Sequence, residues 1–355
     1  MVEWLAGNRI RGTSAERTTG TGFNPVVGGW VELARTTLGS AGDTIEVGSI
    51  PDKRYYMVLW DGINSGNLDD PHLRLGSGSI DTGSNYSSRG DYNGGEGTAI
   101  NQSSILIGKN NGAVRRWGCL YIANKSDKEK LIISNAMQFG ATHPIPARSV
   151  GKWANTSNPL DTLRITNVGT GDFASGSEVV VLGWDTTDTH TSNFWEELAS
   201  VNLSGGAANL IDSGTFAAKK YLWIQLYVGT TGGAVSQRLT FNSDTGANYA
   251  QWRVPDGGTV SNGSGKVNID GFNDDMVTNS GGFTEFFIIN NSSGEKTGFV
   301  NSVSQEATGS GASPTRDVGG LKWTNTSSQI TKLTFTNNKA GSMDTNTILK
   351  VWGHD

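Results

Sequence analysis

The stretch WVELARTTL at residues 30–38 returns as WEELASVNL at residues 195–203, 165 positions later. More paired blocks follow in the same order at separations of 163 to 170: IPDKRY 50–55 with FAAKKY 216–221, DTGSNY 81–86 with DTGANY 244–249, LYIAN 120–124 with FFIIN 286–290, KWANTS 152–157 with KWTNTS 322–327, and VLGWD 181–185 with VWGHD 351–355. A constant order with so little drift indicates that one domain is present twice.

The duplication predicts the organisation of the chain. We expect an N-terminal arm at 1–27, a first domain at 28–185, a linker at 186–193 and a second domain at 194–355. The linker, TTDTHTSN, is short and wholly polar. A period near 165 is too long for a solenoid repeat, so each copy should have its own core. A chain of 355 residues is long enough for two such domains.

Within a copy, strand signals recur every eight to twelve residues between turn-forming residues. LWIQLY at 222–227 alternates between two faces, whereas VVVL at 179–182 and FFII at 286–289 are continuous apolar runs, typical of central strands covered on both sides. Abundant Gly, Ser, Thr and Asn disfavours long helices. The prediction is an all-β protein of two tandem antiparallel β-sandwiches of the jelly-roll type. An immunoglobulin fold fits less well, because each copy is longer and lacks the Cys-Trp-Cys pattern.

Composition excludes several classes of protein. A net charge of -5 and a pI near 5.5 argue against direct nucleic-acid binding. The single cysteine, Cys119, cannot form an internal disulfide and lies in an apolar strand pattern that favours an inert buried thiol. No apolar run is long enough to span a membrane. The first residues lack the layout of a secretion signal, so we expect synthesis in a cytoplasm.

The sequence offers little that would support catalysis. The four histidines, at 72, 143, 190 and 354, form no metalloprotease pair, and no nucleophile-elbow or phosphate-loop motif occurs. A glycosidase would need two acids, and the candidates for such a pair are Asp69, Asp70, Glu96, Asp274, Asp275 and Glu285. The acids that recur in both copies are Glu32 and Glu197, Asp81 and Asp244, and Glu129 and Glu295. Each of these lies in a motif with a simple structural explanation, so we expect no enzyme, catalytic residue, metal or cofactor.

The repeated Asp-Thr-Gly-x-Asn-Tyr block has two interpretations. In the second copy, Asn242 and Asp244 space oxygen donors like the start of a calcium loop. Ser79 replaces the Asn in the first copy, and no bidentate Glu follows in either. The favoured interpretation is a turn in which Asp begins the turn, Gly adopts positive φ, and Tyr starts the next strand. Calcium binding stays open as the alternative.

The tryptophans divide into two groups. Trp153 and Trp323 occupy equal positions before Asn-Thr-Ser, which predicts a shared core or corner role. Those private to one copy are better candidates for contact surfaces: Trp60, Trp117, Trp184, Trp223 and Trp252. Exposed rings on one face would instead suggest a platform for sugars.

The sequence resembles structural proteins of tailed bacteriophages. The resemblance rests on LTFNSDTGANY at 239–249, WLAGNRIRGTS at 4–14 and KRYY at 53–56, and it touches both copies. The first copy departs from it by reading LGSGSI before Asp81, which predicts a longer hairpin there. The resemblance implies sandwich domains of head-decoration, tail or fibre components, and it brings no catalytic residues.

These expectations lead to a non-enzymatic virion protein, a capsid decoration or cement protein that braces the phage head. Its expected partners are the major capsid protein or other virion proteins, together with further copies of itself, a trimer being favoured. The arm would contact the partner through Trp4, Arg9, Ile10, Arg11 and Phe23. The alternative is a carbohydrate-binding module of a tail fibre or adhesin, with a glycan as its ligand.

Overall fold

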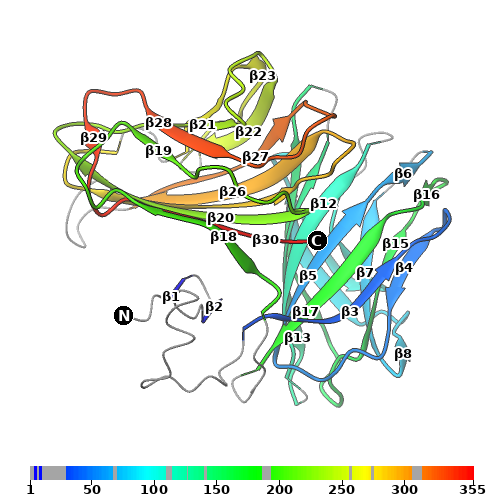
Figure 1. The fold of residues 1–355 in the computed structure, drawn as a ribbon. Coiled ribbons are helices and arrows are strands. Elements are labelled where there is room, and N and C mark those ends of the chain that lie inside the picture. The colour runs from blue at the N-terminus through cyan, green and yellow to red at the C-terminus, as the bar shows by residue number, and fades with distance from the viewer. Residues whose placement is uncertain are drawn as a thin grey trace. The chain divides into compact units, whose positions relative to one another are not determined.

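The structure is a computed structural model that describes residues 4–5, 8–9, 29–66, 70–108, 114–125, 127–139, 142–185, 193–255, 258–272, 276–305 and 314–355, the first two ranges in backbone only. Its strands form two compact units, Met1–Ala136 with Ala147–Trp195 and Met137–Pro146 with Glu196–Asp355 (Figure 1). The described residues contain strands and turns but no helix, which confirms the all-β prediction. Accordingly, none of them forms a helix that could cross a membrane.

In the first copy, an eight-stranded antiparallel sheet faces a smaller one. The large sheet has the order β10 (Gly95–Gln102), β9 (Tyr86–Tyr92), β14 (Ile145–Trp153), β13 (Lys130–Gln138), β12 (Arg116–Ala123), β5 (Tyr55–Gly62), β17 (Glu178–Trp184), β3 (Val31–Thr37). The small sheet has the order β11 (Ile105–Leu106), β7 (Pro71–Ser77), β15 (Thr162–Asn167), β4 (Thr44–Val47), with β8 (Ser79–Ile80) against β7. A short ladder joins β6 (Asn64–Ser65) to β16 (Asp172–Phe173).

The second copy repeats this arrangement. Its large sheet has the order β23 (Ser261–Lys266), β22 (Tyr249–Pro255), β27 (Thr315–Trp323), β26 (Lys296–Ser304), β25 (Gly281–Ile289), β20 (Tyr221–Thr231), β30 (Ile348–His354), β18 (Glu196–Asn202), and β29 (Ser342–Met343) pairs with β20. Its small sheet has the order β24 (Ile269–Asp270), β21 (Gln237–Phe241), β28 (Leu333–Asn337), β19 (Leu210–Asp212). Apart from β8, which has no counterpart, the strands of both sheets have the same neighbours as in the first copy.

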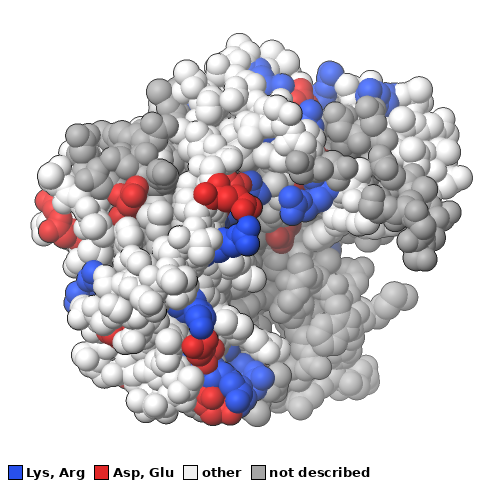
Figure 2. Space-filling model, turned by 180° about the vertical axis from the view of Figure 1, so that it is seen from behind, with Lys and Arg blue, Asp and Glu red and all other residues white. Residues whose placement is uncertain are grey.

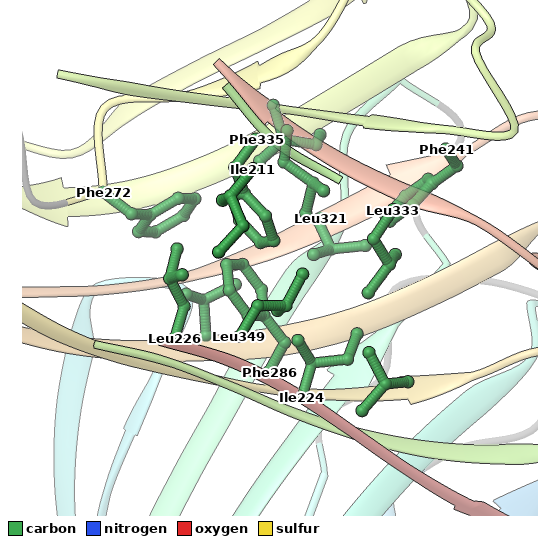
Figure 3. Packing of buried hydrophobic residues seen from close by; sticks show 14 of the residues in the cluster. Ile211, Ile224, Leu226, Phe241, Phe272, Phe286, Leu321, Leu333, Phe335 and Leu349 are labelled. Atoms are coloured by element: carbon green, nitrogen blue, oxygen red, sulfur yellow. The ribbon is translucent and has the colours of Figure 1, made fainter. Parts of the chain in front are cut away.

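Each sandwich closes around its own hydrophobic core. In the second copy, Ile224 and Phe286 of the large sheet point toward Ile211 and Phe335 of the small sheet (Figure 3). In the first copy, Val58 and Leu120 pack with Leu73 and Ile165 in the same way. The apolar runs predicted as strands covered on both faces, 179–182 in β17 and 286–289 in β25, are buried throughout, as expected.

The free edges of both large sheets are irregular. The ladders that hold the edge strands β10, β3, β18 and β23 each contain a register shift, at 99/102, 181/182, 197/199 and 249/251. Such bulges twist an edge and interrupt its row of unpaired backbone groups. Each sandwich is therefore protected against adding a foreign strand at the edges of its large sheet.

The hairpin before Asp81 is longer in the first copy, as predicted. There, β8 folds back on β7, with Gly76 opposite Ile80 and a turn at Gly78, whose φ is 74°. In the second copy, Phe241 leads directly into a turn at Asn242 and Ser243, both of which have positive φ.

Candidate functional site

The repeated Asp-Thr-Gly-x-Asn-Tyr block is a structural corner in both copies. In the second copy, Asp244 Oδ2 accepts a hydrogen bond from Trp323 Nε1 at 2.7 Å, and Asp244 Oδ1 accepts one from Gly246 N at 2.8 Å. The Asn248 amide donates to both carboxylate oxygens, at 2.9 and 3.1 Å. The hydroxyl of Tyr249 donates to the Asp244 carbonyl at 2.9 Å and accepts from Phe241 N at 2.9 Å.

The first copy builds the same corner from equivalent residues. Asp81 Oδ2 accepts from Trp153 Nε1 at 2.8 Å and from the Asn85 amide at 2.9 Å. Tyr86 OH donates to the Asp81 carbonyl at 3.0 Å. The turn interpretation is therefore confirmed, since protein donors occupy both carboxylates. Among the described residues, no group of three or more His, Cys, Asp or Glu side chains is placed to hold a metal ion.

The expected role of the glycine in this turn was wrong. Neither Gly83 nor Gly246 has positive φ. Instead, a Cβ atom on Gly246 would lie 2.8 Å from Asn248 Nδ2, and one on Gly83 would lie 2.9 Å from Asn85 Nδ2. A side chain at this position would therefore crowd the Asn amide that bonds the carboxylate, and glycine avoids this.

The hydrogen bonds of the corner keep its aspartates ionised. Burial by itself would raise the pKa of the Asp244 carboxyl, but the hydrogen bonds from Trp323, Gly246 and Asn248 outweigh burial and lower that pKa below its ordinary value. The pKa of Asp81 is likewise lowered against the effect of burial. Burial raises the pKa of Tyr249 to about 12, so its hydroxyl stays protonated.

A buried lysine lies under each corner tryptophan. Lys296 Nζ donates to the Gly294 and Asn325 carbonyls, both at 2.8 Å, and lies 5.7 Å from the Trp323 ring centroid. Lys130 repeats this arrangement, 5.8 Å from the ring of Trp153. Burial lowers the pKa of both ammonium groups, that of Lys296 to about 8. The two tryptophans thus have the shared core role predicted for them.

The depressed pKa of Lys296 gives a prediction about alkaline pH. Between about 8 and the ordinary lysine value, the unfolded chain binds the proton that the folded chain has lost, so folding stability should rise with pH. We expect the second sandwich to gain about 2 kcal/mol between pH 7.5 and 9.5. Urea unfolding of the intact chain measures this, and Lys296→Met should reduce the gain. A wild-type stability that is flat or falls over this interval would contradict the prediction.

An asparagine at the end of one central strand ties three segments together in each copy. Asn290 is fully buried, donates to the Lys219 and Ile330 carbonyls at 3.0 Å, and accepts from Ile330 N at 2.6 Å. Its counterpart Asn124 accepts from Leu160 N and donates to the Lys53 carbonyl, both at 2.9 Å. The recurring block that ends in Asn therefore preserves these hydrogen bonds in both copies. We call them the clamp, because they hold three segments together inside the fold.

One pair of acids lies close together in a way that the sequence did not suggest. Asp61 of β5 and Glu178 of β17 are register partners, and both are buried. Asp61 is ion-paired with Arg115, whereas Glu178 accepts from Arg35 at 3.3 Å and from Thr37 Oγ1 at 2.6 Å. Asp61 is neutralised by Arg115, and Glu178 shares Arg35 with Glu32, which suits a structural ion network better than general acid catalysis.

The structure describes three of the six acids considered for a glycosidase, Asp70, Glu96 and Glu285. Glu96 is exposed and paired with Arg89 in the first copy, whereas Glu285 belongs to the second, where burial raises its pKa. Asp70 lies directly before β7. Asp69, Asp274 and Asp275 lie outside the described residues. The recurring acids have the structural partners expected of them: Glu32 with Arg35, Glu197 with Lys350, Glu129 with Lys152, and Glu295 with Lys322.

The described histidines and the cysteine each have separate neighbours. His72 Nδ1 lies 2.8 Å from Ser104 Oγ, and burial lowers the pKa of this histidine. His143 contacts the Pro144 carbonyl, and His354 lies beside Glu196. His190 falls outside the described residues. Cys119 is fully buried in β12, as its apolar surroundings predicted.

The partner-binding residues proposed for the arm lie outside the described side chains. Trp4 and Arg9 are register partners in the short ladder between β1 (Trp4–Leu5) and β2 (Asn8–Arg9), which is described in backbone only. Ile10, Arg11 and Phe23 lie outside the described residues altogether. Their role stays a prediction.

The tryptophans private to one copy are not all surface residues. Of the ten described tryptophan side chains, nine are buried. Trp60 belongs to the core of the first sandwich, so its assignment to a contact surface was wrong. Trp117, Trp223 and Trp252 are buried as well, and Trp184 is half-buried, with its ring stacked 5.5 Å from that of Tyr55. The described rings form no exposed platform for a sugar.

Charge is spread thinly over the surface. In Figure 2, Lys and Arg lie next to Asp and Glu on an otherwise uncharged face, and no wide area of one sign is visible among the described residues.

Comparison with known proteins gives no assignment. No family model and no curated protein matches the chain. Among solved structures, the LG1-3 region of the laminin alpha2 chain is 8% identical over 88% of this chain, with a TM-score of 0.20. Domains LG4-5 of mouse laminin alpha1 chain are 10% identical over 91% of this chain and 90% of that one, with a TM-score of 0.15. The chain spans 64% of the length of the first, and scores this low carry no argument about fold or function.

Proposed function

We propose that this chain is a non-enzymatic structural component of a virus particle, a decoration or cement protein that braces the head of a tailed bacteriophage. One observation supports this best. The polar residues that recur in both copies, Asp81 and Asp244, Asn124 and Asn290, and Lys130 and Lys296, are all bonded inside their own sandwich. The duplication has therefore retained two rigid blocks, as a structural brace requires.

Glycan binding by a tail fibre or adhesin is less well supported. A sugar-binding module stacks exposed aromatic rings on the sugar, and nine of the ten described tryptophans are buried. Hydrolysis of a glycan would need two acids held a few ångströms apart with room for substrate, and the buried register partners Asp61 and Glu178 are bound to arginines.

Particle composition tests the proposal. Virus particles purified on a density gradient should contain the protein in a fixed ratio to the major shell protein. Electron cryomicroscopy should place pairs of β-sandwiches on the outside of the head. Absence from the particles, or density only on the tail, would contradict the cement role.

A binding assay then tests the arm. Heads that lack the protein should bind the full chain, whereas a chain without residues 1–27 should stay unbound and keep its circular dichroism spectrum. Equal binding by both chains would exclude the arm as the attachment element. A glycan array, where we expect no signal, separates this function from carbohydrate recognition.

A further inference from the structure

Two aspartates face each other at one end of the first sandwich. Gly42 and Phe173 form an isolated antiparallel bridge, in which each backbone N–H donates to the carbonyl of the other residue, at 3.0 and 2.9 Å. The next pair along this bridge is Asp43 and Asp172, and side chains that flank a hydrogen-bonded pair in this way come closest to each other. Because Phe173 belongs to the core, the two aspartates lie on the outward side, where Asp43 is exposed and Asp172 half-buried.

The two carboxyl groups contact each other directly. They are joined by a hydrogen bond, which an ionised carboxylate cannot donate, so one of the two groups must carry a proton. Mainly through this hydrogen bond, and also through the negative charge of Asp43, the pKa of Asp172 is raised above its ordinary value. The contact therefore depends on one proton that the two groups share.

The charges around this pair do not neutralise it. β16, which contains Asp172, packs against β6 and β4. β6 carries no charge, and Glu46 of β4 is bound to Arg164. Asn167 of β15, whose backbone N–H donates to the Asp43 carbonyl at 2.9 Å, is uncharged. Among the described residues, neither aspartate has a cationic partner, so only the shared proton offsets their repulsion.

The equivalent pair in the second copy is neutral. There the bridge joins Ala208 and Met343, and both of its hydrogen bonds are present, at 2.9 and 3.0 Å. Asn209 and Ser342 take the places of the two aspartates. The fold thus builds the same bridge without acids, and the opposed carboxyl groups are particular to the first copy.

We propose that Asp43 and Asp172 form a proton-controlled latch, which we call the aspartate latch. While the two groups share a proton, the latch holds the segment 39–43 against β16. When both are ionised, their repulsion loosens this end of the first sandwich. The inference does not depend on the proposed function.

The direction of the pH effect follows from the pKa of Asp172. Folding raises this pKa, so the stabilisation is complete below the ordinary carboxyl pKa and is lost as the pH rises through the higher, folded value. The corner aspartates behave in the opposite way, because the pKa of Asp244 is lowered by folding. The latch should therefore open over a pH range in which the corners stay intact.

Hydrogen exchange of the intact chain, measured by mass spectrometry between about pH 4 and pH 7, tests the latch. Rates are corrected for the intrinsic effect of pH, and EDTA excludes divalent cations. Wild-type peptides from 38–44 and 170–176 should be about threefold less protected at the higher pH, the size expected of an interaction between exposed charges. Asp172→Asn supplies an amide that can donate to the Asp43 carboxylate, so this variant should keep its protection at both pH values. Asp43→Asn should do the same.

The second copy supplies the matched control within the same sample. Peptides from 205–210 and 340–345 contain the equivalent bridge between neutral neighbours and should lose no protection as the pH rises. Asp127→Asn is the control variant, since Asp127 is an exposed acid paired with Lys125, and it should behave like wild type. Circular dichroism checks that each variant is folded.

The outcomes that would overturn the latch are distinct. Wild-type peptides from 38–44 and 170–176 that are equally protected at both pH values would show that the shared proton holds nothing. A loss at the higher pH that persists in both Asp172→Asn and Asp43→Asn would assign the effect to other groups. A parallel loss in the second-copy peptides would make it a property of the whole fold.

Discussion

Replacing Asn290 with alanine is expected to lower the free energy of unfolding of the second sandwich by about 3–5 kcal/mol. The side chain is fully buried and serves the Ile330 backbone N–H and the carbonyls of Lys219 and Ile330. Alanine would leave these groups without partners, and each unsatisfied buried group costs about 1–3 kcal/mol. Because the amide joins the segments that lead into β20 and β28, its loss should loosen both sheets at once.

Chemical denaturation of the intact chain, followed by tryptophan fluorescence, measures the change. Asn262→Ala is the matched control, since Asn262 is exposed on the edge strand β23 and should leave stability unchanged. Asn124→Ala should have a comparable effect on the first sandwich. A loss below about 1 kcal/mol for Asn290→Ala would show that water replaces the amide and that the clamp is not needed.

The strands could be predicted because their signal is local. Alternation in LWIQLY at 222–227 and the continuous run at 179–182 depend only on which sides of a strand are covered. The structure places Leu222, Ile224 and Leu226 in the core, as the alternation requires. The internal repetition also predicted the corner residues Trp153 and Trp323, because a tryptophan that recurs in both copies should have the same role in each.

The features that could not be predicted from the sequence depend on contacts between segments that are far apart in the chain. The glycine of the corner was assigned a positive φ because that is its commonest use in turns. Its actual reason, the approach of the Asn248 amide over Gly246, appears only once the side chains are placed. Likewise, the pairing of Asp61 with Glu178 follows from the register between β5 and β17, which no local pattern encodes.

The burial of Trp60 could have been predicted from the repeat. Its occurrence in one copy alone suggested a surface role. Yet the residue at the equivalent position of the second copy, Leu226, is also apolar, and both belong to the cores of their sandwiches. Because both residues at this position are apolar, although they are not identical, the repeat predicts a buried position for Trp60.

Asp244→Asn is expected to destabilise the second sandwich by about 2–4 kcal/mol at pH 7. Asparagine offers one acceptor oxygen where the carboxylate offers two. In either orientation its NH₂ group must face a donor, the backbone N–H of Gly246 or the indole N–H of Trp323. In one orientation the indole is left without an acceptor, which removes the link between the turn and β27, and in the other the Gly246 N–H is left without one.

The pH dependence separates this mechanism from a simple loss of packing. The pKa of Asp244 is lowered by folding, so its contribution is complete above the ordinary carboxyl pKa and disappears as pH falls through the lower, folded value. Wild type should therefore lose stability below about pH 4, and its advantage over Asp244→Asn should shrink, as urea unfolding at pH 7 and pH 3 would measure. Glu96→Gln, at an exposed ion pair, should match wild type at both pH values. A gap between wild type and Asp244→Asn that stays constant down to pH 3 would mean that the carboxylate charge does not hold the corner.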